Sequence, residues 1–354
     1  MTVPTPTLHR RSFLQGLVGT AAAIGLAACA PGGGSGADAE AGSSKPVSTS
    51  VPPGAKLKIA SALGAQQLQL RLAGLDDLPF TVTDWPNIGA GPDVINAFRA
   101  HSLDVANNAG IPPIQAHYQR FGARIVAVDI TRKPNYVFAT KPGSDIEDVD
   151  DFRGRKLAFS QGQAQGVVLL RALDKAGIDY DEVKLVPLTS NQFLTALQAG
   201  QVDIAPLGIS QVPAYLGQYG KDGAHEIETD VVDLLNILWA PSTVLADPAK
   251  AAAVAAFIPV WAKGLVWVYE NPDEWIDRFY VDTQNLSRDE AAKIVRLSNK
   301  PLLPPKWDEA VAWEQETIDL LAKGGFVKSF DAGDLFDRRF EPLAARAVAA
   351  EYRS

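Results

Sequence analysis

Two segments of the chain read almost alike: AFRAHSLDVA at residues 97–106 and ALQAGQVDIA at residues 196–205. They are offset by 99 residues, and four of the ten positions are identical. Each copy has the pattern of the end of an amphipathic helix, a tight turn and a short strand. A loop with glycine and proline follows each strand, at 107–113 and at 206–209. An internal repeat of this kind indicates that one structural unit is built twice.

A second pair of segments supports the duplication. A predicted strand at 57–61 leads through a glycine-bearing loop into a predicted helix at 65–73 that ends at a glycine. A predicted strand at 156–160 leads in the same way into a predicted helix at 164–176 that ends at a glycine. Glycine directly after a helix is a common C-terminal cap. Both halves therefore share the order strand, serine, glycine loop, helix, glycine.

The alternation of strands and helices predicts an α/β protein of two lobes, each a mainly parallel sheet with helices on both faces. In such sheets ligands bind beyond the carboxyl ends of the strands, beside the starts of helices. Two facing lobes would form a cleft that is lined by matching loops and closes around a small molecule by a hinge motion. Further predicted strands are 80–85, 124–130, 136–140 and 182–187.

The composition is that of a folded protein with an acidic balance. The chain has 354 residues, 47% of them hydrophobic and 21% charged. This is enough for roughly two domains and excludes global disorder. The formal net charge of −8 argues against nucleic acid as a partner, because phosphate binding requires a basic face. One cysteine excludes an internal disulfide, and the four histidines show no ligand spacing, so we expect no metal and no cofactor.

The N-terminal residues have the pattern of an export signal. Arg10 and Arg11 precede an apolar run that ends in LAAC, a sequence that resembles a bacterial lipobox. Residues 1–28 are therefore predicted to be a twin-arginine signal, with Cys29 as the lipidated N-terminus of the mature chain. The segment 29–55, rich in glycine, serine and proline, is predicted to be a flexible tether. These features predict a body outside the cytoplasmic membrane, held there by a lipid anchor.

The last hundred residues are predicted to be helical, with proline-bearing turns between the helices. Ser287 and Glu290 have the spacing of a capping box. Tryptophans on apolar helical faces are interpreted as packing residues: Trp261, Trp267, Trp275, Trp307 and Trp313. The predicted helices are 248–267, 273–280, 287–297 and 306–323.

With these segments in order, the chain resembles the solute-binding proteins of ABC importers of the nitrate, sulfonate and taurine type. The resemblance covers about residues 56–250. The segments that carry it are the two repeat copies at 97–106 and 196–205, DVDDFRGRKLA at 148–158 and LRALDKAG at 170–177.

The resemblance implies a two-lobed periplasmic-binding-protein fold of the type II class, with a helical C-terminal segment. The chain is then expected to cross between the lobes near Val137–Lys141 and near Asn236–Ala240. Residues 56–138 and 240–354 would form the first lobe, and residues 139–239 the second.

The resemblance also implies a function. The protein would capture a small molecule in the cleft, close around it, and deliver it to an ABC permease and its ATPase. Closure requires that the ligand bind the closed form more tightly than the open form. The implied protein is an extracytoplasmic, lipid-anchored monomer without enzymatic activity.

Candidate ligand-binding residues follow strand ends or precede helices, where free N–H groups favour an anionic or strongly accepting group. In the first lobe they are Ser61, Leu63, Gly64, Asn87, Ile88, Gly91, Asn108 and Ala109. In the second lobe they are Ser160, Gln161, Gln163, Gln165, Asn191 and Gly208. Ser160 and Asn191 are equally well explained as N-caps of helices. We expect Asn108 and Gln163 to face each other across the cleft.

The identity of the ligand stays open. Sulfonate, nitrate and related small organic molecules suit the resemblance, but the glutamines at 161–165 can bind either an oxyanion or a neutral polar ring. Trp85 and Trp239, near predicted strand ends, suit either stacking on a ligand or core packing. Arg120 and Arg132 are candidate partners of an anion, and surface placement suits them as well.

Catalytic signatures are absent from the sequence. It has no GxSxG elbow and no P-loop, and GAG at 89–91 lacks the third glycine of a dinucleotide fingerprint. His101 occupies the turn position that Gly200 has in the other repeat copy, which indicates a solvated turn residue. No catalytic residue is predicted. Two other functions stay open: an exported enzyme and a ligand sensor. An enzyme like the thiamine-pyrimidine synthases, which share this fold, would need a cysteine- and histidine-rich site that the sequence does not show.

Overall fold

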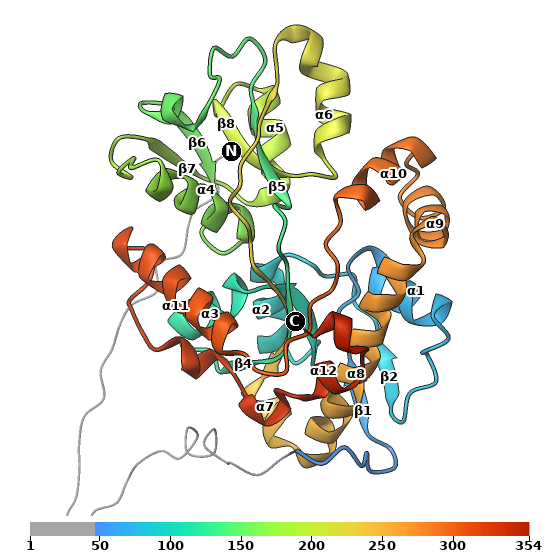
Figure 1. Ribbon diagram of the computed structural model, residues 1–354. Helices are drawn as coiled ribbons and strands as arrows, with labels where there is room; N and C mark the ends of the chain where they lie inside the picture. Colours follow the sequence, from blue (N-terminus) through green and yellow to red (C-terminus); the bar gives the residue numbers. More distant parts are fainter. Residues whose placement is uncertain (1–46, 354) are drawn as a thin grey trace, which may run out of the picture. The chain divides into compact units, whose positions relative to one another are not determined.

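The structure, a computed structural model, describes residues 47–353 (Figure 1). The predicted export signal, the predicted lipidation site Cys29 and the first part of the predicted tether lie outside these residues. The last part of that tether does not stand apart from the body. Val47 and Val51 pack against the hydrophobic core, and Ala55 is buried.

The strands are arranged in the same order twice. One group runs β2–β1, continues through a parallel bridge between Ile59 and Val105, and ends β3–β10–β4. The other runs β7–β6–β8–β5–β9. The strands are β1 (Lys56–Lys58), β2 (Thr81–Asp84), β3 (Ala106–Ala109), β4 (Ala123–Ile130), β5 (Tyr136–Thr140), β6 (Lys156–Phe159), β7 (Lys184–Pro187), β8 (Ile204–Gly208), β9 (Glu226–Ile227) and β10 (Leu235–Pro241).

In each group the strand that follows a crossing between lobes runs against its neighbours. β10 is antiparallel to β3 and β4, and β5 is antiparallel to β8 and β9. The other pairs, β1 with β2 and β6 with β7 and β8, are parallel. The predicted α/β class is confirmed, and the duplication extends to the topology. Four of the seven strand pairs among the described residues are antiparallel, because β5 and β10 each lie between two strands of opposite direction.

The crossings lie slightly earlier than predicted. The expected positions, near Val137–Lys141 and Asn236–Ala240, fall inside β5 and β10, whereas the connecting segments are residues 131–135 and 228–234. Each apolar stretch after a connection pairs along its whole length with the sheet that it enters. The division into two lobes stays a prediction, with its borders moved to these connections.

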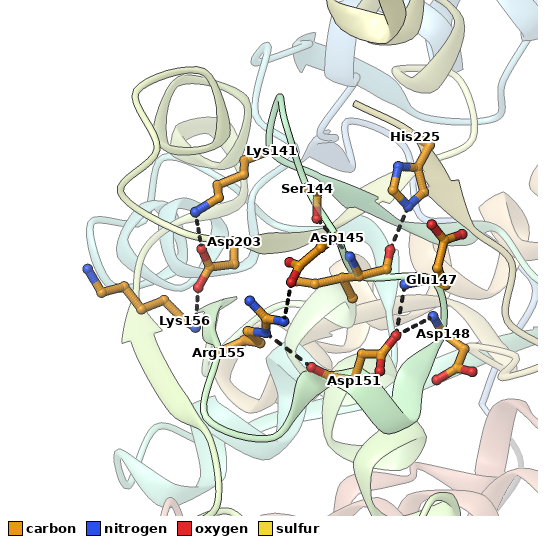
Figure 2. A network of polar contacts seen from close by, with 11 residues as sticks. Lys141, Ser144, Asp145, Glu147, Asp148, Asp151, Arg155, Lys156, Asp203 and His225 are labelled. Atoms are coloured by element: carbon orange, nitrogen blue, oxygen red, sulfur yellow. Dashed lines mark hydrogen bonds and ion pairs between the residues drawn. The ribbon is translucent and has the colours of Figure 1, made fainter. Parts of the chain in front are cut away.

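The aspartate of the duplicated segment makes the same contacts in both copies. Asp104 accepts a hydrogen bond from the last N–H of β1 at 2.9 Å and pairs with Lys250 Nζ at 2.7 Å. Asp203 accepts one from the first N–H of β6 at 2.8 Å and pairs with Lys141 Nζ at 2.6 Å (Figure 2). In each lobe this carboxylate therefore ties the strand of the repeat to the neighbouring strand and to a lysine from a distant element.

The helices surround these strands (Figure 1). Several begin or end as the sequence predicted: the capping box of Ser287 and Glu290 is formed, and His101 is an exposed turn residue with φ 53°. A π-helical turn, Ile276–Val281, continues α9. The helices are α1 (Ala65–Leu72), α2 (Gly91–Arg99), α3 (Ile111–Tyr118), α4 (Ala164–Lys175), α5 (Phe193–Gln198), α6 (Val212–Tyr219), α7 (Ser242–Ala246), α8 (Pro248–Glu270), α9 (Pro272–Trp275), α10 (Arg288–Leu297), α11 (Asp308–Lys323) and α12 (Leu343–Arg346).

Helix α8 contributes many buried side chains to the larger of the two hydrophobic cores. By length and composition it is the one helix among residues 47–353 that could cross a membrane, and 56% of its most apolar window is buried inside the protein. Trp261 on this helix is fully buried, as is Trp307, and Trp275 is 7% exposed. The packing role predicted for these three tryptophans is confirmed.

Candidate functional site

The predicted residues that follow β1 hold a tight loop in place. Leu63 and Gly64 have left-handed φ angles of 54° and 73°, and the Leu63 N–H donates to Asn87 Oδ1 at 2.7 Å. Ser61 is buried, and its Oγ accepts a main-chain N–H from the first turn of α1 at 3.1 Å. Ile88 packs half-buried against the core. The polar side chains of this loop are therefore engaged within the first lobe.

Asn108 is engaged on both sides of its amide. Its Nδ2 donates to Gly89 O at 2.8 Å, and its Oδ1 accepts from Trp239 Nε1 at 2.9 Å. Trp239 is fully buried and packs edge-on against Phe98, with ring centroids 4.8 Å apart. The suggestion that Trp239 stacks on a ligand is therefore wrong, because the core encloses the ring. Trp85 likewise packs against the core, half-buried.

Gln163 is the centre of a network at the start of α4. Its Oε1 accepts from Ser160 Oγ at 2.6 Å and from the Ser190 N–H at 2.8 Å, and its Nε2 donates to Ser190 Oγ at 2.8 Å. Asn191 is exposed in the neighbouring loop, and Gln165 lies half-buried in the first turn of α4. The network joins the loops that precede α4 and α5.

The opening expected between Asn108 and Gln163 is closed in this structure. A Cβ atom added at Gly91, the first residue of α2, would lie 2.6 Å from Pro112 Cγ and 3.1 Å from Gly162 O. Both distances are shorter than a van der Waals contact, so only glycine fits at this position. The main chain of the second-lobe loop therefore packs directly on α2 and α3.

Side chains bind the lobes together beside this contact. Gln115 Nε2 on α3 donates to Gln161 O at 3.0 Å, and Gln161 Nε2 donates to Phe326 O at 2.8 Å. On the other side of α4, Arg171 Nη2 donates to Thr317 Oγ1 on α11 at 2.7 Å. The loop of the predicted glutamines and helix α11 thus hold the lobes in a closed arrangement.

A cavity of about 470 Å³ remains between the ends of β3 and β8. The predicted residues Ala109 and Gly208 both line it, and they occupy the same position in the two repeat copies, 99 residues apart. The lining residues are Ala109, Thr131, Asn135, Tyr136, Gly208, Ile209, Ser210, Asp233, Leu235, Asn236, Tyr280, Ile294, Ser298 and Asn299. Below, this set is called the inter-lobe cavity.

Most of this wall carries no prediction from the sequence. It is made of the two crossing segments, 131–136 and 233–236, and of residues around α10, such as Ser298 and Asn299. The two predicted crossings could have identified the residues of these segments, because two connections between the same lobes must pass the bottom of the cleft. The α10 residues had no such signal.

Hydrogen bonds of amide side chains hold residues of the wall in place. Asn299 Nδ2 donates to Asn135 Oδ1 at 3.0 Å, and Asn236 Nδ2 donates to Asp129 Oδ2 at 3.1 Å. Burial raises the pKa of Asp129 to about 6, although hydrogen bonds from Asn236 and from the Leu302 N–H oppose the rise. These bonds fix the backbone of both crossing segments.

Two acids give the region an unusual charge pattern. Burial raises the pKa of Asp233 to about 7 and that of Glu314 to about 8; the charge of Asp233 adds to the second rise, and the charge of Arg171 opposes both. Glu314 is 1% exposed, and its Oε2 has no hydrogen-bond partner among the described residues. A Cβ added at Gly110 would lie 1.7 Å from Glu314 Oε1, so the carboxyl group occupies the space beside this glycine.

A second hollow, of about 690 Å³, lies between α4 and α11. Its charged side chains are paired with one another: Lys175 with Asp230, and Lys323 with Asp174 at 2.6 Å. We therefore regard the inter-lobe cavity as the candidate site. Among residues 47–353, no group of three or more His, Cys, Asp or Glu side chains is arranged to hold a metal ion.

Comparisons with known proteins agree with this fold. The family described as NMT1/THI5 like matches residues 92–275, just over half of the chain. A protein of Escherichia coli (strain K12) that is named for the binding of aliphatic sulfonates is 35% identical over 151 residues, which are 41% of this chain and 47% of that protein. The chain thus spans about half the length of the curated relative that it matches.

Two solved structures are similar over most of the chain. The periplasmic aliphatic sulphonate binding protein SsuA from Escherichia coli has a TM-score of 0.66 at 21% identity, covering 83% of this chain and 100% of that one. The alkanesulfonate-binding protein SsuA from Xanthomonas axonopodis pv. citri, bound to MOPS, has a TM-score of 0.65 at 18% identity, covering 85% and 99%. These likenesses show the fold of a periplasmic binding protein, as the sequence resemblance predicted. The chain belongs to the NMT1/THI5-like family.

Proposed function

We propose that this protein is the extracytoplasmic solute-binding component of an ABC importer, and that it captures a small organic molecule in the inter-lobe cavity. The composition of the cavity wall carries the proposal. The wall contains matching residues of both repeat copies and both crossing segments, so its shape depends on how the lobes approach. Its volume of about 470 Å³ is in the usual range for small-molecule sites. Family membership and the periplasmic-binding-protein fold support the same role.

Binding would be coupled to closure of the lobes. Opening would break the contact of Gly91 with Gly162 and the bonds of Gln161 to Gln115 and Phe326. A solute that touches both lobes favours the closed form by its difference in affinity for the two forms. The closed form would then be recognised by the permease.

The remaining parts of the role rest on the sequence. The lipobox supports anchoring at Cys29, and the twin-arginine pattern supports export to the outer side of the cytoplasmic membrane. The partners would be an ABC permease and its ATPase, with the binding protein acting as a monomer. Aliphatic sulfonates are the first ligands to test, because the E. coli relative is named for them. Nitrate and related small organic molecules follow.

The test is a thermal-shift and calorimetry screen of the purified protein against sulfonates, nitrate, amines, pyrimidines and aromatic acids. A ligand at one hundred times its Kd should raise the free energy of unfolding by about 2.7 kcal/mol. A variant, Gly208→Leu, should lose the response, because the added side chain enters the cavity, where the nearest atom to its Cβ is 3.7 Å away. The matched control is Gly217→Leu on the exposed face of α6, which should keep it.

Two outcomes would contradict the proposal. A folded protein that responds to no compound of the panel would argue against solute binding at this site. Conversion of a bound compound to a product would favour the exported-enzyme alternative. Binding without turnover leaves a sensor as the rival role, and a neighbouring gene pair for a permease and an ATPase would reject it.

A further inference from the structure

The inter-lobe cavity has an acidic wall without a basic side chain. Among its lining residues the ionisable groups are Asp233, Tyr136 and Tyr280, and none of the lining residues is lysine or arginine. The others offer hydroxyl and amide groups. An anion in this cavity would meet a carboxylate instead of a cation, and like charges at short range repel.

The nearest arginines are committed elsewhere. Arg132, which follows the lining residue Thr131, forms a two-pronged ion pair with Glu309. Arg171 lies 3.6 Å from the ring centroid of Trp313 and donates to Thr317 on α11. Guanidinium groups held by several partners are poor candidates for reorientation toward a ligand.

The carboxyl group of Asp233, in contrast, is free to accept hydrogen bonds from a ligand. Its main-chain oxygen accepts from the Thr131 hydroxyl, which fixes the backbone of the crossing segment. Its carboxyl oxygens make no hydrogen bond or ion pair with any residue in the described part of the chain, although they lie beside the cavity. Desolvation of this half-buried side chain raises the pKa of the carboxyl to about 7.

Glu314 adds a second acid behind the first. It is nearly inaccessible, and its Oε2 has no partner among residues 47–353. A positively charged donor in the cavity would pair with Asp233, whereas Glu314 does not line the cavity and lies behind it.

We propose, on the basis of the solute-binding role above, that the ligand of the inter-lobe cavity carries a protonated nitrogen, as an amine or amidinium, that pairs with Asp233. The hydroxyl and amide groups of the wall then bind its neutral polar atoms. A sulfonate without an amino group should bind more weakly than such a cation, because the charge of Asp233 opposes it. The site therefore selects a cationic or zwitterionic organic molecule.

Two charge-matched probe series test this ligand class by calorimetry and thermal shift. The first is benzamidinium, benzamide and benzenesulfonate, and the second is butylammonium, butyramide and butanesulfonate. Within each series the cation should bind best. Asp233→Asn should weaken binding of the cation by about 10-fold or more, because it removes the charged acceptor of a hydrogen bond. Asp230→Asn, which changes an exposed acid three residues earlier, should leave it unchanged.

The outcomes separate this inference from the proposed function. Preferential binding of the sulfonate, unaffected by Asp233→Asn, would overturn the inference and leave the solute-binding role intact. Failure of every probe with the folded wild-type protein would argue against the cavity as a solute site altogether. If Asp233→Asn does not fold, the order of affinities in the wild-type protein decides the question by itself.

Discussion

Replacement of Glu314 by glutamine should make the protein more stable at alkaline pH. The carboxyl group is 1% exposed, and its raised pKa of about 8 means that the folded protein holds this proton through the neutral range. The unfolded chain releases it near pH 4.5. The folded state therefore binds more protons than the unfolded state between these values, and the free energy of unfolding falls as pH rises through this window.

The size of the effect follows from the two pKa values. Each tenfold change in the ionisation equilibrium is worth about 1.4 kcal/mol, so a rise from 4.5 to about 8 corresponds to a loss of about 5 kcal/mol by pH 9. Asp233 ionises in the same range and repels Glu314, so the two acids share this loss. Glutamine removes the share of Glu314. We expect Glu314→Gln to match the wild type within about 1 kcal/mol at pH 5 and to exceed it by about 2 kcal/mol or more at pH 9.

The assay is urea unfolding, followed by tryptophan fluorescence at five pH values from 5 to 9 without ligand. Glu274→Gln, at an exposed position on α9, is the control and should follow the wild-type curve. Parallel curves for the wild type and Glu314→Gln over the whole range would refute the reasoning. They would mean that the folded protein stabilises the ionised carboxylate, which requires a partner for Glu314 that the described residues do not supply.

Three further changes test the packing around the site, each by urea unfolding. Gly110→Ala should lower the free energy of unfolding by about 2 kcal/mol, because the added methyl group meets Glu314 Oε1. The same change in a Glu314→Ala background should cost much less. An equal cost in both backgrounds would show that this contact is not the cause. Asp203→Asn should cost about 1–2 kcal/mol at pH 7, and this difference should shrink as pH falls below 3.8, the ordinary pKa of an aspartate. Hydrogen bonds from Lys141 and from a β6 N–H, acting against burial, hold the pKa of Asp203 below that value. Trp239→Phe should lower the free energy of unfolding by about 1–2 kcal/mol through the lost hydrogen bond to Asn108, and it should leave the affinity for solutes unchanged. A changed affinity would show that Trp239 takes part in ligand binding.

The fold could be predicted because the duplicated segments carry strong local patterns. Both copies end a helix at a turn residue with positive φ, His101 or Gly200, and continue into a strand through an aspartate with the same two bonds. Strand β5 was predicted with its observed bounds, because its apolar run is bounded by polar turns. These features depend on neighbours in the sequence or on a single repeat, so periodicity and spacing reveal them.

The site was less predictable because its wall depends on contacts between distant segments. Ala109 and Gly208 could be named from the strand ends, but Asp233 and Tyr136 face the cavity only because the chain crosses there twice. Asn108 and Gln163 follow the rule for strand ends and helix starts, yet each is engaged by a partner from another loop, Trp239 and Ser190. No local pattern shows whether a side-chain amide has already found its partner.

The placement of the cavity also bears on what a fragment of this protein could do. One side of the wall ends at Ala109, the other at Gly208, and both connections complete it, so neither half of the polypeptide contains a binding site. Two separate halves would have to associate before they could bind anything, and their affinity would then depend on protein concentration. Joining the halves in one chain replaces that encounter with an intramolecular one at a high effective concentration. In the linked chain, assembly of the proposed site therefore does not depend on protein concentration.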